Sequence, residues 1–345
     1  MQDIYILDAG CICSLGDSMD ACWDKLGKEI EVETKYSFEV SLPSKLKRSS
    51  DRFSKLYMCV LDQMLGRSQE MLQNCPKDRI GTIFSSEYGP IGTNLQFARE
   101  VMEKDPDICS PSRFSNTVAN ACVGIACMNH GFTGVSTMLQ GSNCLSFSMD
   151  LIAEDKADLI FCGYAEEYNE EIFHALHQVA GMEEKRFTEN CEMFLIGNEG
   201  YKEKSLCAIK AISEINLRCN AIVLPVANER NEKLVHKCVE NCMGEIDGEI
   251  DGIIYSSDND SFGLMETKVL RDRFQDIPMS GRVNGLAGDT LGSSLNMNIL
   301  LGIMCIKNQQ LHPELFGEVP KGCKRLLVTG YDIMGNYTCV VLEAC

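Results

Sequence analysis

The segment Leu159-Ile-Phe-Cys-Gly163 carries no polar side chain over five consecutive residues. Such a run predicts a strand that is covered on both faces, as at the centre of a sheet packed between helices. Helical patterns precede this strand at 116–130 and 142–155, and a further strand is expected between them at 134–140. Strands that alternate with helices in this way indicate an α/β fold.

The same alternation begins again after residue 205. Further strands are predicted at 207–215, 221–226, 252–256, 325–330 and 338–343, and further helices at 230–243, 264–274 and 291–306. The chain has 345 residues, which is long for one simple core and suits two closely packed halves. We therefore predict two similar units, an N-terminal half of residues 1–205 and a C-terminal half of residues 206–345.

The composition narrows the class of protein. With 45% hydrophobic and 24% charged residues, the chain is typical of a soluble globular protein. It has no apolar run of about 18 residues, so no membrane span is expected. The first ten residues contain Asp3 and Asp8 and no basic residue, which is unlike a signal peptide, so we expect a cytoplasmic protein. The net charge of −18 argues against a nucleic-acid partner.

The 19 cysteines show no repeated spacing and no C-x-x-C pair. The closest pairs are Cys11 with Cys13 and Cys238 with Cys242, and neither has further ligands at the spacing of a usual metal site. We expect reduced thiols that act mostly as small hydrophobic side chains, and no bound metal. Patterns of the G-x-G-x-x-G and P-loop types are absent as well, so no cofactor is expected.

Seven stretches, taken in order, resemble the β-ketoacyl synthases, which are the condensing enzymes of fatty-acid and polyketide synthesis. They are residues 6–26, 79–93, 110–136, 157–167, 192–200, 288–313 and 331–343, and together they span nearly the whole chain. The resemblance implies a thiolase-like fold, in which two similar βαβαβαββ halves form a layered α-β-α-β-α arrangement.

The resemblance also shows where this chain departs from the family. The family's reaction requires a cysteine nucleophile at a helix N-terminus, and two histidines that drive decarboxylation and stabilise the enolate. Counted from Gly134, the nucleophile position falls on Asn143, and the first histidine position falls on Ser257 or a neighbour. The second histidine position, in the AGDTLG segment of residues 287–292, is occupied by Asp289. The resemblance therefore implies that no catalytic residue of the family remains.

Cys144, next to the nucleophile position, is the fallback nucleophile. Successive residues of a helix are rotated by about 100°, so we expect the Cys144 side chain to point away from the nucleophile site and to pack as an ordinary cysteine. An aspartate at position 289 would add a negative charge that opposes an enolate.

Other features of the family have counterparts in this chain. Arg48, Arg52 and Lys55 match the basic residues with which the family docks acyl carrier protein, although a solvated helix face is the alternative. Phe194 matches the aromatic gate of the acyl pocket, and Gly335 remains from the Gly-rich turn at the pocket floor.

Three functions stay open from the sequence. The favoured one is an inactive subunit of the chain-length-factor type, which pairs as a heterodimer with a competent ketosynthase in fatty-acid, polyketide or polyene synthesis and receives acyl carrier protein. The second is an acyl transferase or hydrolase with Cys144, Ser142 or Ser257 as nucleophile and Asp289 as base or orienting group. The third is a homodimeric module that binds acyl groups.

Overall fold

The computed structural model describes residues 3–26, 28, 34–38, 44–103, 108–142, 144–179, 181–219, 226–258, 260–290, 294–317 and 322–345. Ten strands form one continuous sheet, in the order β3-β2-β4-β5-β1-β6-β10-β9-β7-β8. Their bounds are β1 Ile4–Ile12, β2 Ile80–Ser86, β3 Ser136–Gln140, β4 Leu159–Glu166, β5 Asn190–Gly197, β6 Cys207–Asn216, β7 Gly252–Ile254, β8 Met279–Ser280, β9 Arg325–Tyr331 and β10 Asn336–Glu343. The strand predicted at 221–226 lies, except for Val226, outside the described residues.

The sheet repeats one topology twice. When the strands are numbered within each half, both halves show the same order. From the outer edge of the sheet to its middle, it is third, second, fourth, fifth and first. The parallel and antiparallel pairings match as well, because β2 is parallel to β3 and β4 as β7 is parallel to β8 and β9. The two halves meet where β1 pairs antiparallel with β6. The predicted α/β fold with two similar halves is therefore confirmed.

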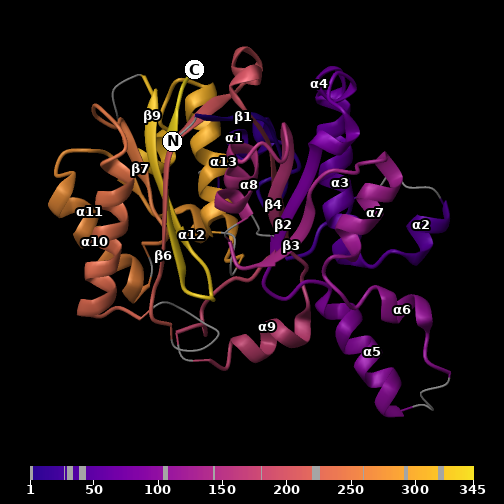
Figure 1. Cartoon of the computed structure of the whole chain (residues 1–345). Helices are drawn as coiled ribbons and strands as arrows, with labels where there is room; N and C mark the ends of the chain where they lie inside the picture. The colour runs from indigo at the N-terminus through magenta and orange to yellow at the C-terminus, as the bar shows by residue number, and fades with distance from the viewer. Residues whose placement is uncertain are drawn as a thin grey trace.

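Helices fill the space between the halves and cover their outer faces (Figure 1). Helices α8 (Cys144–Ala153) and α13 (Ser294–Lys307) lie in the middle layer, whereas α3 (Arg52–Arg67) and α7 (Ala121–His130) cover the first half and α10 (Glu229–Met243) and α11 (Ser261–Arg273) cover the second. The result is the predicted α-β-α-β-α layering. The remaining helices are α1 Met19–Lys25, α2 Ser44–Ser49, α4 Gln69–Gln73, α5 Ile91–Glu103, α6 Pro111–Ser115, α9 Glu170–Leu176, α12 Val283–Ala287 and α14 Pro313–Phe316.

The central elements are buried as their apolar sequences predict. Every residue of β4 is buried, and so is every residue of α13 from Ser294 to Ile306. An apolar helix of this kind must be enclosed on all sides, which the middle layer provides. None of the helices in the described ranges is long and apolar enough to cross a membrane.

Gly163, the last residue of the segment that predicts the buried strand, lies where β4 and β5 leave no room for a side chain. A Cβ atom at this position would lie 2.1 Å from the carbonyl oxygen of Glu192 and 2.8 Å from the Cα of Met193. Both atoms belong to the backbone of the neighbouring strand and cannot move without shifting the sheet.

We predict that Gly163→Ala lowers the free energy of unfolding by about 3 kcal/mol, because overpacking at a backbone contact strains the central sheet. Gly66, an exposed glycine of α3 with nothing within 4 Å of its Cβ position, provides the control. Gly66→Ala should raise stability by about 0.5–1 kcal/mol. Urea denaturation of the three proteins measures both effects, and equal stability of wild type and Gly163→Ala would show that the strands can separate freely.

Candidate functional site

The loop before α8 is held by a buried carboxylate from the other half of the chain. Ser142 donates hydrogen bonds from its N–H and its hydroxyl to Asp332 Oδ2, at 2.7 and 2.9 Å. Asn336 donates to Asp332 as well, from its backbone N–H and its side-chain amide. Gly141 adopts a φ of +92°, and a Cβ there would lie 2.8 Å from Asp332 Oδ2. Asn143, the predicted nucleophile position, lies outside the described residues.

Gly335 shapes the turn that carries Asp332. Its φ is +86°, and a Cβ would lie 2.7 Å from the carbonyl oxygen of Leu217. Its own carbonyl accepts a hydrogen bond of 2.6 Å from the Leu217 N–H. The conformation and the close approach both require glycine. The structure thus explains this residue through the turn, and its place in an acyl pocket stays a prediction.

Cys144 is the first residue of α8 and is 1% exposed. Burial raises the pKa of its thiol to about 11. A thiol with this pKa is protonated at neutral pH, whereas nucleophilic attack requires the thiolate. Cys144 is thus a buried thiol, and its part in any chemistry stays a prediction.

Phe194 lies in the same cluster of apolar side chains as Cys144. Phe194 of β5 pairs with Ala9 of β1 on one side and with Cys162 of β4 on the other. It is 1% exposed and belongs to the large cluster of apolar side chains that contains Cys144. Phe194 and Cys144 thus share one apolar core, and the role of Phe194 as a gate stays a prediction.

Ser257, at the first histidine position, is enclosed by two glycines. A Cβ at Gly263 would lie 1.9 Å from the Ser257 carbonyl oxygen, and a Cβ at Gly281 would lie 2.7 Å from its carbonyl carbon. Ser257 itself is fully buried. The segments that carry Gly263 and Gly281 pack closely against Ser257, which is therefore enclosed within the protein.

Asp289, at the second histidine position, has a counter-ion. Lys185 Nζ lies 2.5 Å from Asp289 Oδ2 and 3.9 Å from Asp260 Oδ2. Burial of Lys185 favours its neutral form, but the charge and hydrogen bond of Asp289, together with Asp260, outweigh that effect and raise its pKa. The Tyr331 hydroxyl donates to Asp260 at 3.0 Å. The negative charge expected at position 289 is therefore neutralised, which the sequence analysis missed because Lys185 is 104 residues away.

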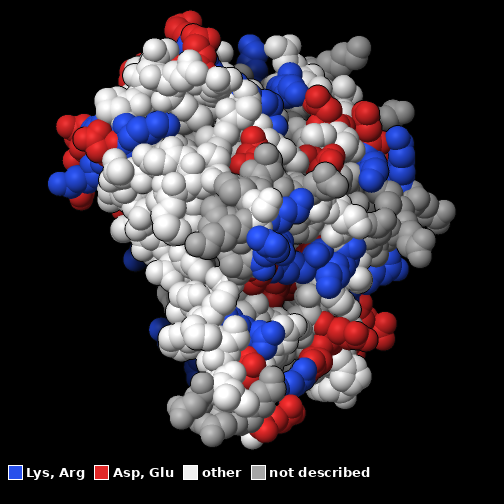
Figure 2. All heavy atoms as spheres, turned by 90° about the vertical axis from the view of Figure 1, so that its right-hand side faces the viewer, with Lys and Arg blue, Asp and Glu red and all other residues white. Residues whose placement is uncertain are grey.

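The three predicted docking residues have different surroundings. The Arg52 guanidinium donates to the fully buried Glu189, with 2.9 Å between Nε and Oε2, and to the Tyr36 carbonyl at 2.7 Å. Arg52 thus holds internal segments together. Arg48 on α2 is exposed and Lys55 on α3 is half-buried. Figure 2 looks at the side of the molecule that bears α2 and α7, and basic side chains gather in the middle of this face.

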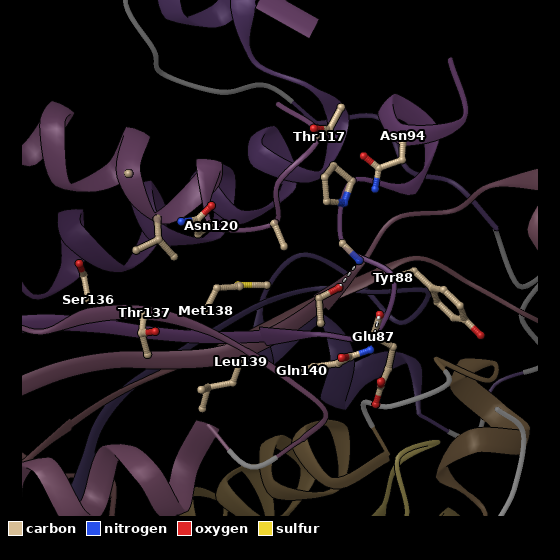
Figure 3. Close-up of a pocket in the computed structure, with 16 residues that line it drawn as sticks. Glu87, Tyr88, Asn94, Thr117, Asn120, Ser136, Thr137, Met138, Leu139 and Gln140 are labelled. Atoms are coloured by element: carbon tan, nitrogen blue, oxygen red, sulfur yellow. Dashed lines mark hydrogen bonds between the residues drawn. The ribbon is translucent and has the colours of Figure 1, made fainter. Parts of the chain in front are cut away.

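A pocket of about 590 Å³ opens beside β3. It is lined by residues 86–90 after β2, by Asn94 of α5, by Thr117, Ala119 and Asn120, by Val123 and Gly124 of α7 and by residues 136–140 of β3. Figure 3 shows Glu87 and Gln140 side by side at one end of this pocket.

Glu87 is the residue of this pocket that the sequence analysis did not find. It is 8% exposed, and neither of its carboxyl oxygens has a hydrogen-bond partner among the described residues. Burial raises its pKa to about 9, and the nearby carboxylates of Asp332 and Glu166 add to the shift. Glu166 accepts hydrogen bonds from Ser86 and Tyr164, and burial raises its pKa to about 7. At neutral pH Glu87 is a neutral acid, able to donate and to accept a hydrogen bond at the pocket wall.

We predict that Glu87 makes the protein less stable as the pH rises. The pKa of Glu87 is higher in the folded state than in the unfolded state. Its contribution to the free energy of unfolding is therefore complete below the ordinary pKa of 4.5 and is lost as the pH rises through about 9. Glu87→Gln should therefore lose less stability than wild type between pH 6 and pH 9, whereas the exposed Glu154→Gln should behave as wild type. Urea denaturation across this range tests this, and parallel curves for wild type and Glu87→Gln would contradict it.

Comparisons with known proteins place this geometry in context. No protein-family model matches the sequence. One stretch of 130 residues is 24% identical to 3-oxoacyl-[acyl-carrier-protein] synthase 2 of Synechocystis, and it spans 36% of this chain but only 31% of that protein. Among solved structures, a ketosynthase in complex with its chain length factor from Xenorhabdus doucetiae has a TM-score of 0.80 at 16% identity, over 100% of this chain and 98% of that one.

A second solved structure shows the same likeness. A type II polyketide synthase acyl carrier protein in complex with its ketosynthase, bound to the hexaketide, matches with a TM-score of 0.78 at 12% identity over the full length of both chains. At these identities the likeness concerns the fold. The chain thus has the thiolase-like fold of the β-ketoacyl synthases, as the resemblance of its sequence implies.

Proposed function

We propose that this chain is a non-condensing, ketosynthase-like subunit that pairs with a competent ketosynthase in fatty-acid or polyketide-type synthesis. The observation that carries the proposal is the state of the two histidine positions. Ser257 is enclosed by backbone, and Asp289 is tied to Lys185. The chain has no histidine between His236 and His312, so these segments offer no imidazole for decarboxylation or for enolate stabilisation.

β3 is the last strand at one end of the sheet in the described part of the chain, and this supports a partner that extends the sheet. The Thr82 N–H of β2 donates to the Val135 carbonyl, and main-chain groups alternate in direction along a strand. The N–H and C=O groups of Ser136, Met138 and Gln140 therefore point away from β2, toward the open edge. An exposed edge of this kind is a template for strand pairing.

Exposed apolar side chains in and before α7 also support the proposed interface with the ketosynthase. Val118 is 53% exposed and Met128 of α7 is 73% exposed. Obligate interfaces bury large apolar areas, and α7 packs against β3. The similar structure from Xenorhabdus doucetiae is a ketosynthase in complex with its chain length factor, which is the kind of pairing proposed here.

A docking surface for acyl carrier protein is the second part of the proposal. Of the predicted docking residues, Arg48 is exposed and Arg52 and Lys55 are half-buried, and Lys47 is exposed next to Arg48 on α2. Such a cluster in a chain of net charge −18 suits an acidic partner. Arg52 contributes through its hold on Glu189, which fixes the start of α3.

We predict that the chain accepts no acyl group. Intact-mass spectrometry after incubation with acylated carrier protein, alone and with a co-expressed ketosynthase of the same organism, should show an acyl adduct only on the ketosynthase. An adduct on this chain that disappears in Cys144→Ser would overturn the proposal and identify an acyl transferase or hydrolase.

We also predict that Met138→Pro weakens association with the ketosynthase by roughly tenfold or more, because proline removes an outward N–H and blocks strand pairing. The bond from Thr82 to Val135 is untouched, so the subunit should keep its circular dichroism spectrum. Leu264→Ala, an exposed residue of α11 on the other half, is the control. Unchanged co-purification of Met138→Pro would exclude the β3 edge as the interface, and association only with itself would favour the homodimeric acyl-binding module.

A further inference from the structure

Three buried thiols meet near the N-terminus of the chain. Cys11 belongs to β1, Cys13 follows it two residues later, and Cys22 lies in α1. The Sγ atom of Cys22 is 3.6 Å from that of Cys11 and 3.6 Å from that of Cys13. All three sulfur atoms lie within 4.8 Å of one another.

The local fold explains why these residues converge. Residues two apart in an extended segment point to the same side, which brings Cys11 and Cys13 together. A backbone bridge between Cys13 and Gly16 then turns the chain back toward α1. Gly16 adopts a φ of +151°, and a Cβ there would lie 2.9 Å from Ala21 Cβ, so glycine permits the close approach of the helix. The helix thereby lays Cys22 over the other two thiols.

The size of the triangle suits a metal ion. A point equidistant from three sulfur atoms with these separations lies about 2.0–2.4 Å from each, and a zinc–thiolate bond is about 2.3 Å long. The exposed fractions of the three cysteines are 0%, 3% and 0%, so the centre of the triangle is screened from water. Soft thiolate ligands in such a setting select thiophilic cations.

Two neighbouring features complete the surroundings. Glu192 faces Cys11 in the register of β1 and β5, is fully buried and interacts electrostatically with Cys22. A surface pocket of about 790 Å³ is lined by Cys13, with Asp17 and Tyr36 among its other residues. The pocket gives an ion a route to Cys13, and a carboxylate or a water molecule from this side offers an oxygen as fourth ligand.

We propose that Cys11, Cys13 and Cys22 form a zinc site. Binding replaces three S–H bonds by three zinc–sulfur bonds and releases three protons to solvent, so affinity rises with pH. The ion would clamp α1 onto β1, and through α1 it would steady α13, since Lys307 of α13 already pairs with Asp20 of α1 at 2.7 Å. No metal was predicted here from the sequence, because Cys22 lies at no usual ligand spacing from Cys11 and Cys13.

Metal analysis of the full chain tests the site directly. The protein is purified under reducing conditions, stripped with a chelator, and titrated with Zn²⁺ and, separately, with Co²⁺ as a spectroscopic probe. We expect one ion per chain and a sulfur-to-cobalt charge-transfer band in the near ultraviolet. Cys13→Ser and Cys22→Ser should each bind roughly tenfold or more weakly and lose most of that band. Cys75→Ser, which changes a buried cysteine outside the cluster, should bind as wild type.

Three results would overturn the proposal. One is a chain that binds no zinc when reduced. Another is equal binding by wild type, Cys13→Ser and Cys22→Ser. The third is a chain that forms a Cys11–Cys22 or Cys13–Cys22 disulfide in air, seen as a mass loss of two hydrogens, and takes up no cobalt after reduction. Circular dichroism checks each variant for folding, and Cys13→Ala replaces any serine variant that fails to fold. None of these readouts depends on the ketosynthase partner.

Discussion

The carboxylate of Asp332 connects the second half of the chain to the loop that begins α8 in the first half. It accepts hydrogen bonds from Ser142 and Asn336, so its negative charge is compensated by donors although it is fully buried. The arrangement fixes Gly141 and Ser142, and with them the point at which α8 starts. Its charge also contributes to the raised pKa of Glu87. The geometry at the candidate site therefore rests on a contact between segments 190 residues apart.

The thiolase-like framework is present, and the residues that the resemblance assigns to the two histidine positions are Ser257 and Asp289. The segments around Ser257 pack closely, because a Cβ atom at Gly263 or Gly281 would collide with the Ser257 carbonyl group. Asp289 takes part in a small charge network with Lys185 and Asp260. These are the positions at which the resemblance predicts the family's histidines, and the neutral acid Glu87 gives the nearby pocket a polar wall.

Much of the fold follows from local sequence. The strand at 159–163 and the long helix α13 were predictable because residues enclosed on every side must be apolar. The repeated topology was predictable because the same alternation occurs twice. The helix predicted at 116–130 begins only at Ala121, since Thr117 bonds back to Phe114 and the residues before Ala121 form turns.

The site was less predictable, because its defining contacts join distant segments. Lys185 reaches Asp289 and Arg52 reaches Glu189 across more than a hundred residues, and neither spacing carries a pattern. Cys22 joins Cys11 and Cys13 only because a turn folds the helix back. In each case a polar or thiol group finds its partner through tertiary packing, and periodicity gives no sign of it.

The two ends of the sheet differ in one respect that limits assembly. β3 presents five residues at one edge, whereas β8 at the other edge has only two residues and packs against α14. A chain with pairing edges at both ends could add copies without limit and form a filament. In the described part of the chain, only the β3 end offers a strand of that length, so strand addition of the kind proposed above would stop after a single partner.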